Sequence, residues 1–520
     1  METTERFACV AIFGATLAAC SPAGPTYPVA EKPLTDIAGD LEAGRVSSEA
    51  VTLSYLGRIK IEDPKVRAVL ALNPKALDAA RAADARRAAG QRRGPLDGVP
   101  ILIKDNIDFA GMPTTAGSLA LAENIPALDS PVVQRLTEAG AVILGKTNLS
   151  EWANFRSNWS ISGWSGVGGL TRNPYSPART PCGSSSGSGA AAAMSLAAAA
   201  IGTETNGSIT CPSAMNGLVG LKPTVGLVSR TGIVPISHNQ DTAGPMARNV
   251  ADAAAVLTAI AGSDPADLAT GEADAHKTDY LKGLDPNALK GTRIGVMRFV
   301  TGYSPKLNAV FETALAALKA QGAELIDINS FGAQNYSQYS QVILNTDFKF
   351  DLNAYLAKMP PAVKTRTLAD LIAFNKTEPR ETVLFGQDRF EMAEATNGFD
   401  DPIYKQAVET AQRITGPEGI DRALRENNVV ALVTPTAEPA FLDDPATGLD
   451  AGGQSASSIP AIAGYPHLTV PMGAVAGLPV GLSFIGARWS EQVLLSLGHA
   501  FEQATHARRP PDGTAGKVSF

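Results

Sequence analysis

A segment rich in glycine and serine, residues 181–222, carries the most distinctive chemistry of the sequence. Its first loop, PCGSSSGSG, leads into an Ala-rich stretch, which leads into a second loop, TETNGS, at 203–208. Small side chains let backbone segments approach closely and expose their N–H groups, as the binding of an anion or oxyanion requires. A flexible linker is the simpler interpretation, but a linker would not flank an Ala-rich helix within an apolar chain. The segment therefore indicates an enzyme site.

The first loop also matches the nucleophile elbow of α/β-hydrolases. Residues 183–187, GSSSG, fit the pattern G-x-S-x-G, which requires a buried strand before it. The preceding residues are SPARTP, and two prolines and a charge do not fit a central strand. The candidate histidine of such a triad, His467, lies in GYPHLTVP beside prolines. The elbow interpretation therefore fails on its context.

Lys104 offers a base for a different serine chemistry. It ends the apolar run GVPILIK at 98–104, which predicts a buried strand. Burial disfavours the charged amine, so the lysine pKa falls from about 10.4 and the neutral amine can accept a proton. Taken alone, Lys104 is better explained by a salt bridge with Asp105. Together with the two serine loops it favours a serine–lysine enzyme.

These motifs together resemble the amidase signature family, whose hallmark is a Ser–cis-Ser–Lys triad. GVPILIKDN matches the lysine motif of the family, and CGSSSGSG matches its Gly/Ser stretch. The resemblance implies that Lys104 is the base, that Ser184 is the bridging serine in a cis peptide linkage, and that Ser208 is the nucleophile. Further matches are GKTNLSEW at 145–152, GLKPT at 220–224, DTAGPMAR at 241–248 and GLPVGLSFIG at 477–486. The resemblance extends from about residue 31 to the C-terminus.

The resemblance also implies a mechanism. Ser208 is expected to attack an amide carbonyl while its proton passes through Ser184 to neutral Lys104. Backbone N–H groups would bind the oxyanion, each strong donor contributing about 3–4 kcal/mol. The residues expected to provide them are Thr205, Asn206 and Gly207. The family usually has glycine where Asn206 stands, a substitution that backbone donors tolerate.

Within the family the sequence is most similar to bacterial peptide amidases, through segments such as SPARTPCGSSSGSG and IGTETNGSITCP. This similarity implies hydrolysis of the C-terminal amide of peptides to a carboxylate and ammonia, without a cofactor. One alternative is a broader amidase that acts on small aryl, acyl or cyclic amides. Another is a lipid-anchored protein that binds peptides without hydrolysing them, against which the intact Lys104, Ser184 and Ser208 argue.

Aromatic and cysteine residues surround the expected triad. Trp152, Trp159 and Trp164 lie close together with Phe155, and the cluster fits a peptide-binding cleft about as well as the core. Cys182 precedes Ser184 by two residues, and Cys211 follows Ser208 by three. A disulfide between these cysteines requires Cα atoms within about 7 Å. We expect buried free thiols instead, neither of them catalytic.

The N-terminal residues predict export. Residues 7–19, FACVAIFGATLAA, are too few to span a bilayer but suit a signal peptide. LAAC at 17–20 resembles a bacterial lipobox, although the acidic METTER start is atypical and an ordinary N-terminal helix is the alternative. We expect a lipoprotein-type signal over 1–20, lipidation of Cys20, a Pro-rich tether over 21–30 and a periplasmic enzyme held at the membrane by lipid only.

The composition limits the other partners. The 520 residues include 44 Lys and Arg against 51 Asp and Glu, a formal net charge of −7. No basic stretch offers a nucleic-acid footprint. The 4 cysteines and 5 histidines show no metal-ligand spacing, so we expect no metal. The resemblance implies a monomer acting on a small-molecule or short-peptide amide.

Short apolar segments predict the strands that must position these residues. They lie at 99–103, 141–144, 293–297, 429–433 and 468–470. Helical patterns alternate with them, for example over 65–90 and 310–321. The alternation predicts the α/β class. The family resemblance implies one amidase-signature domain over 31–520, a large mixed β-sheet covered by helices on both faces.

Overall fold

The computed structural model describes residues 27–300, 302–331, 336–442 and 455–513. The predicted signal segment, Cys20 and most of the predicted tether lie outside these residues. Among the described helices, none is both long and apolar enough to cross a membrane.

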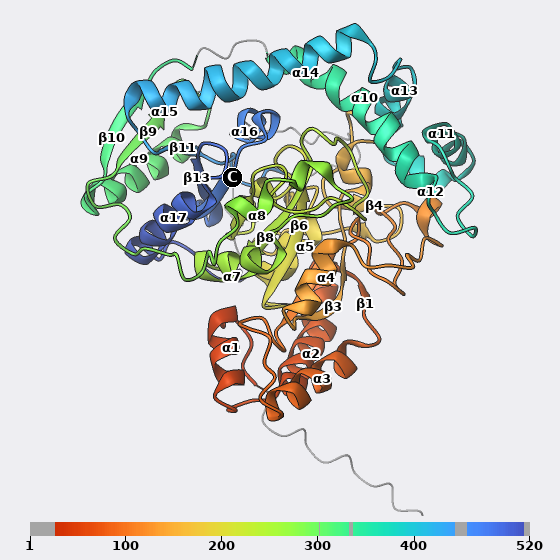
Figure 1. Ribbon diagram of the computed structural model, residues 1–520, viewed down its shortest axis with the longest axis horizontal. Coiled ribbons are helices and arrows are strands. Elements are labelled where there is room, and N and C mark those ends of the chain that lie inside the picture. Colours follow the sequence, from red (N-terminus) through yellow and green to blue (C-terminus); the bar gives the residue numbers. More distant parts are fainter. Residues whose placement is uncertain (1–26, 301, 332–335, 443–454, 514–520) are drawn as a thin grey trace, which may run out of the picture.

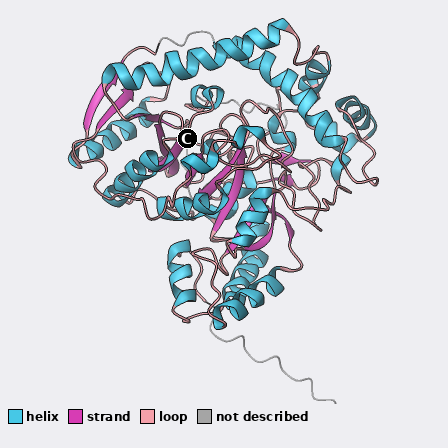
Figure 2. Cartoon of the chain, in the orientation of Figure 1, coloured by secondary structure: helices cyan, strands magenta, loops and turns pink. Residues whose placement is uncertain are grey.

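An eleven-stranded mixed sheet forms the centre of the fold (Figure 1; Figure 2). In spatial order its strands are β1 (Val69–Leu72), β3 (Val142–Thr147), β2 (Pro100–Lys104), β6 (Ala199–Glu204), β8 (Thr242–Ala247), β7 (Val219–Lys222), β12 (His467–Val475), β13 (Leu478–Ile485), β11 (Ala431–Pro435), β9 (Arg293–Met297) and β10 (Glu324–Ile328). A separate small sheet pairs β4 (Trp164–Ser165) with β5 (Gly169–Leu170). The five predicted strands are β2, β3, β9, β11 and β12, some of them longer or shifted. The predicted α/β class and mixed sheet are confirmed.

Helices cover both faces of this sheet. The helices of this part of the molecule are α1 (Leu34–Glu42), α2 (Ser48–Val66), α3 (Ala76–Ala88), α4 (Pro131–Glu138), α5 (Ser186–Ala193), α6 (Thr210–Met215), α7 (Val250–Ile260), α8 (Ala273–His276), α9 (Pro305–Ala320), α16 (Ser458–Ala463) and α17 (Glu491–Thr505), some of which pack on the sheet and some on other helices. Successive residues of a strand point to opposite faces. On β12, Leu468 lies against Gly498 of α17, whereas Thr469 lies on the side of Ala214 of α6. The two helices therefore pack on opposite faces.

A further group of helices arches over one end of the sheet in Figure 1. It contains α10 (Tyr336–Leu356), α11 (Leu368–Thr377), α12 (Pro379–Thr382), α13 (Asp388–Glu394), α14 (Pro402–Thr415) and α15 (Arg422–Asn427). A separate apolar cluster joins α10, α11 and α13 to Trp152 and Phe155. This region is therefore fixed to the body by its own core.

The helix predicted over 65–90 is wrong in its first part. Arg67 adopts a left-handed conformation (φ 53°) that ends α2, and β1 follows before α3 begins. β1 is an edge strand that pairs with β3. A helical conformation is disfavoured for Asn73 because it precedes Pro74. The apolar VLAL run at 69–72 instead pairs its backbone in the sheet. Gly90 (φ 71°) follows Ala89, the C-cap of α3.

The Ala-rich helix α5 lies in the main hydrophobic core. Ala190, Ala191, Ala192 and Ala193 are all fully buried. A Cβ on Gly187 would lie 2.4 Å from the carbonyl oxygen of Asn148 and 2.5 Å from that of Ala68, so only glycine fits there. Small residues thus let α5 approach neighbouring backbone and fix the loop that precedes it.

Candidate active site

Lys104 ends β2 between the neighbouring strands β3 and β6, and its side chain is fully buried. Its Nζ lies 2.8 Å from Ser184 Oγ and 2.8 Å from Thr203 Oγ1. The carbonyl oxygen of Thr203 lies 3.4 Å away. Asn106 Nδ2 donates a 3.0 Å hydrogen bond to the same Thr203 hydroxyl. Lys104 is therefore held by hydroxyl and carbonyl groups rather than by a carboxylate.

Burial lowers the pKa of Lys104 from its ordinary value to about 7. Removal from water disfavours the ammonium form, and this effect exceeds the opposing attraction of Asp241 and Glu204. A large fraction of Lys104 is therefore neutral near pH 7, as base chemistry requires.

Ser184 is presented by the loop that leads into α5. The Gly183–Ser184 peptide bond is cis, as the sequence predicts. Ser184 is fully buried, and its carbonyl oxygen accepts a 3.0 Å hydrogen bond from Ser150 N. A Cβ on Gly183 would lie 2.3 Å from Ser150 Oγ, so a larger residue here would have to displace the Ser150 side chain. The loop is thus packed against the segment after β3.

Ser208 lies in the turn between β6 and α6 and is 8% exposed. Its carbonyl oxygen accepts a 3.2 Å hydrogen bond from Ser185 N, which joins the two serine loops. Glu204 Oε2 accepts hydrogen bonds from Ile209 N at 2.8 Å and Thr210 N at 2.9 Å. Within the described residues no hydrogen bond joins Ser208 Oγ to Ser184 Oγ. The structure thus places the predicted serines on adjoining loops, with the lysine bonded to Ser184.

The three predicted oxyanion residues line the same turn. In the part of the chain that the structure describes, the backbone N–H groups of Thr205, Asn206 and Gly207 donate to no other group. Their side chains and backbone are fixed: the Thr205 hydroxyl donates to Asp241 at 2.5 Å, the Asn206 amide oxygen accepts from Ser457 at 2.7 Å, and Gly207 has φ 85°. The turn therefore offers free N–H donors on a rigid backbone.

Two cavities flank this turn. The smaller, about 210 Å³, lies against the serine loops. It is lined by Cys182, Gly183, Asn206, Gly207, Cys211, Met215, Ala437, Phe441, Ser455 and Ser457, among others. The larger, about 780 Å³, reaches Asn106, Thr203 and Thr205 on the side of Lys104 and is rimmed by several aspartates. The two cavities thus lie on either side of the 205–207 turn.

The expected aromatic cleft lining is not found in either cavity. Trp152 is buried and packs edge-to-face on Phe390 of α13, and Trp164 packs on Phe385 in the same manner. Trp159 is 54% exposed. The sequence does not reveal that the aromatic rings packed against these tryptophans come from the α10–α15 region. The core interpretation therefore holds for Trp152 and Trp164.

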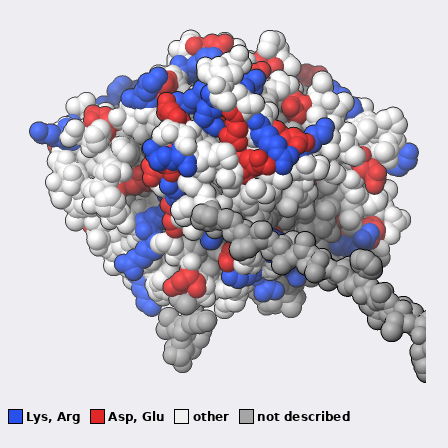
Figure 3. Space-filling view, turned by 90° about the horizontal axis from the view of Figure 1, so that it is seen from below, with Lys and Arg blue, Asp and Glu red and all other residues white. Residues whose placement is uncertain are grey.

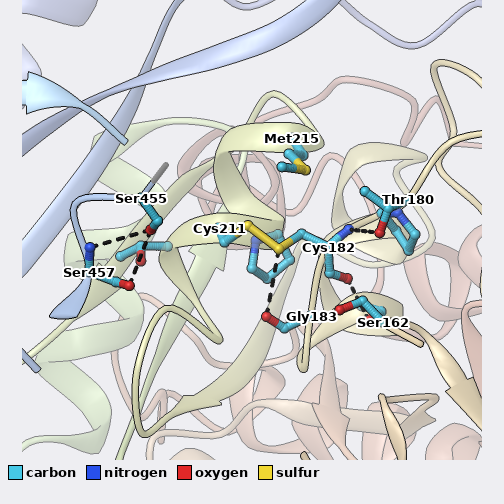
Figure 4. Close-up of a disulfide and its surroundings, with 12 residues drawn as sticks. Ser162, Thr180, Cys182, Gly183, Cys211, Met215, Ser455 and Ser457 are labelled. Atoms are coloured by element: carbon cyan, nitrogen blue, oxygen red, sulfur yellow. Dashed lines mark hydrogen bonds between the residues drawn. A yellow bond between two sulfur atoms is a disulfide. The ribbon is translucent and has the colours of Figure 1, made fainter. Parts of the chain in front are cut away.

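The expected free thiols are a disulfide. Cys182 and Cys211 form an S–S bond with Cα atoms 6.0 Å apart (Figure 4). The prediction is wrong because sequence spacing does not give the distance between two loops that only the folded sheet brings together. Both residues are half-buried and line the smaller cavity.

One group of described residues has the geometry of a metal site, His238 with Asp347 and Asp351. Its donors already have partners: Asp351 accepts from His238 N and pairs with Nδ1, and Asp347 accepts from Tyr404 Oη at 2.6 Å. These bonds account for the cluster without an ion.

On the face in Figure 3, basic and acidic side chains are interspersed.

Comparison with known proteins gives consistent matches over nearly the whole chain. The sequence model of the family described as Amidase matches residues 50–495. A native peptide amidase from Stenotrophomonas maltophilia is 51% identical with a TM-score of 0.88, covering 93% of this chain and 99% of that one. A structure of the peptide amidase PAM with the competitive inhibitor chymostatin is 50% identical with a TM-score of 0.90, covering 93% and 100%. A probable amidase from Arabidopsis thaliana is 38% identical over 501 residues, 94% of this chain and 92% of that protein.

Proposed function

Since the chain belongs to the amidase signature family and is an amidase, a hydrolase of C–N bonds, we propose that it hydrolyses the C-terminal amide of peptides with a Ser–cis-Ser–Lys triad. The observation that carries the proposal is the 2.8 Å contact between buried Lys104 Nζ and Ser184 Oγ, on a loop hydrogen-bonded to that of Ser208. Lys104, Ser184 and Ser208 take the roles of base, bridge and nucleophile.

The surroundings of Lys104 orient its lone pair. A neutral amine has two N–H groups and one lone pair, and the hydroxyl and carbonyl of Thr203 accept N–H hydrogen bonds. The lone pair is then left for the Ser184 hydroxyl. Asn106 holds Thr203 in turn. Thr203 and Asn106 are thus positioning residues, and the sequence motifs alone do not identify them.

The reaction follows from this order of bonds. Ser208 Oγ attacks the amide carbonyl carbon as its proton passes to Ser184 Oγ, and the Ser184 proton passes to Lys104 Nζ. The N–H groups of the 205–207 turn bind the oxyanion, a contribution of about 3–4 kcal/mol for a strong donor. The Lys104 ammonium returns its proton through Ser184 to the leaving nitrogen, which departs as ammonia. Water then attacks the acyl-enzyme by the same proton path.

The proposed substrate class rests on the similarity and on the smaller cavity. Relatives at 50% and 51% identity are peptide amidases. The cavity beside the serine loops presents apolar Met215, Ala437 and Phe441 together with polar Asn206 and Ser457. Such a wall suits a peptide end, with apolar side-chain contact and hydrogen bonds to the backbone.

The experiment that tests this function measures ammonia release from a short C-terminally amidated peptide, with mass spectrometry of the product. We expect conversion of amide to acid without internal cleavage, and loss of turnover by orders of magnitude in Ser208→Ala. Ser496→Ala on α17, remote from the site, is the matched control and should keep full activity. Hydrolysis of small aryl or acyl amides but not of peptide amides would overturn the proposed substrate class. Binding of the peptide without any hydrolysis would favour the non-catalytic alternative.

We also propose that the enzyme is exported as a monomer, with the membrane contacted only through lipid at Cys20, and that it needs no nucleic acid or cofactor. The disulfide supports export, because disulfides persist in oxidising compartments and are rare in the cytosol. Cell fractionation with intact mass of the N-terminal peptide tests this, since Cys20→Ala should release the enzyme from the membrane fraction. An unmodified N-terminus beginning at Met1 would contradict the proposal.

A further inference from the structure

The Cys182–Cys211 disulfide joins the two loops that carry the serines (Figure 4). Cys182 is separated from Ser184 by one residue. Cys211 lies at the start of α6, and its N–H donates to the Gly207 carbonyl at 2.8 Å, so it is fixed to the turn that holds Ser208. The crosslink therefore spans the two segments whose separation sets the distance between Ser184 and Ser208.

Several hydrogen bonds also cross between these segments. Ser185 Oγ accepts from Thr203 N at 3.2 Å and donates to the Thr203 carbonyl oxygen at 3.0 Å. Ser185 N donates to the Ser208 carbonyl at 3.2 Å, and Asn216 Nδ2 donates to the Pro181 carbonyl at 2.8 Å. Each loop is also firmly attached elsewhere. Glu204 and Asp241 hold the Ser208 turn, whereas Ser150 holds the Ser184 loop. These attachments maintain each loop separately, and within the described residues the disulfide is the covalent bond that links the two loops directly.

We propose that the Cys182–Cys211 disulfide is a positioning crosslink for catalysis, whose reduction by a dithiol lowers turnover while the fold persists. The inference rests on the proposed serine–lysine mechanism. Proton transfer depends steeply on distance, and a displacement of about 1 Å in a catalytic group can cost about 100-fold in rate. The remaining hydrogen bonds keep the loops adjacent, so reduction weakens the relay rather than abolishing the site.

The position of the bond also exposes it to reductant. Both cysteines are half-buried and line the cavity of about 210 Å³ beside the serine loops. A thiolate of the dithiol attacks one Sγ, the S–S bond breaks, and the other cysteine leaves as a thiolate and takes a proton. The second thiol of the reductant then displaces the first cysteine and closes the reductant's own disulfide. Two electrons pass from the dithiol to the protein, which ends with two thiols.

The test compares kcat and KM of the full chain before and after treatment with dithiothreitol, with peptide mapping by mass spectrometry to verify the state of the bond. Both an amidated peptide and a simple aryl amide serve as substrates. We expect kcat to fall at least tenfold on whichever substrate is hydrolysed, KM to change much less, and reoxidation to restore kcat. Hydrolysis of the aryl amide alone would count against the proposed substrate while still testing the crosslink.

Two variants separate positioning from other effects. Cys182→Ser/Cys211→Ser should show the reduced kcat without any treatment and should not respond to dithiothreitol. Ser496→Ala, which keeps the crosslink and lies outside the site, should respond like the wild type. Circular dichroism of the reduced wild type at the assay temperature replaces the first variant if that variant does not fold. Verified reduction with unchanged kcat would overturn the proposal, as would a fall in kcat that only matches the fraction of unfolded protein.

Discussion

Two lysines on neighbouring strands, Lys104 of β2 and Lys146 of β3, are both fully buried yet have opposite surroundings. Lys146 Nζ lies 3.1 Å from Asp105 Oδ1 and donates to the Ile107 carbonyl at 2.7 Å. Among the residues that the structure describes, the hydrogen-bond partners of Lys104 are only hydroxyl and carbonyl groups. The salt bridge to Asp105 that its sequence neighbourhood suggests for Lys104 is made by Lys146 instead. Lys146, paired with a carboxylate, stabilises the fold. Lys104, held by hydroxyl and carbonyl groups, is available to accept a proton.

The largest expected effect on turnover comes from removing the Lys104 amine. Lys104→Met keeps an unbranched side chain of similar length and deletes a buried polar group without leaving a carboxylate unpaired. We expect kcat to fall by about 10²–10⁴-fold, the usual range for a general base. The free energy of unfolding in urea should stay level or rise, because an apolar group replaces a buried amine. Near-normal turnover in this variant would remove Lys104 from the mechanism.

Lys146→Met is the matched change on the neighbouring strand. Here the buried Asp105 carboxylate loses its partner, and breaking a buried pair costs about 3–5 kcal/mol. We expect the free energy of unfolding to fall by this amount in urea titrations, while the folded fraction keeps a kcat within a few-fold of the wild type. A large loss of kcat without a loss of stability would contradict the division of roles between the two lysines.

The sequence accounts for much of this arrangement but not for the groups that each lysine and cysteine contacts. The apolar run before Lys104 predicts its burial at a strand end, and the family resemblance places Ser184 and Ser208. The bonds from Thr203 depend on the pairing of β2 with β6, which no local pattern gives. Likewise, the pairing of Asp105 with Lys146 and the crosslink from Cys182 require distances that arise only when separate strands and loops meet. Residue types thus reveal the candidates, and the tertiary structure determines which groups they contact.

The pH dependence of kcat/KM gives a smaller and reversible test of the same comparison. Burial lowers the pKa of Lys104 to about 7. The amine is neutral above this pH and becomes an ammonium below it, so activity is present above pH 7 and declines as the pH falls. We expect about a tenfold loss of kcat/KM for each pH unit well below 7. A rate that stays constant from acid to alkaline pH, with chemistry limiting, would argue against a lysine base.

The smallest expected effect concerns Asp241, the first of the carboxylates that raise the pKa of Lys104. Asp241→Asn removes a negative charge but keeps an oxygen that can accept from Ile236 N and Ser237 N, while its NH2 group can donate to the Thr205 hydroxyl oxygen. Without that charge the Lys104 ammonium is less stable, so the acid limb of kcat/KM should move to lower pH, by less than about one unit. Because burial raises the pKa of Asp241 itself to about 6, the shift should be clearest above pH 6, where the wild-type carboxylate is ionised. An acid limb that moves to higher pH in Asp241→Asn would mean that this carboxylate does not act on Lys104 through its charge.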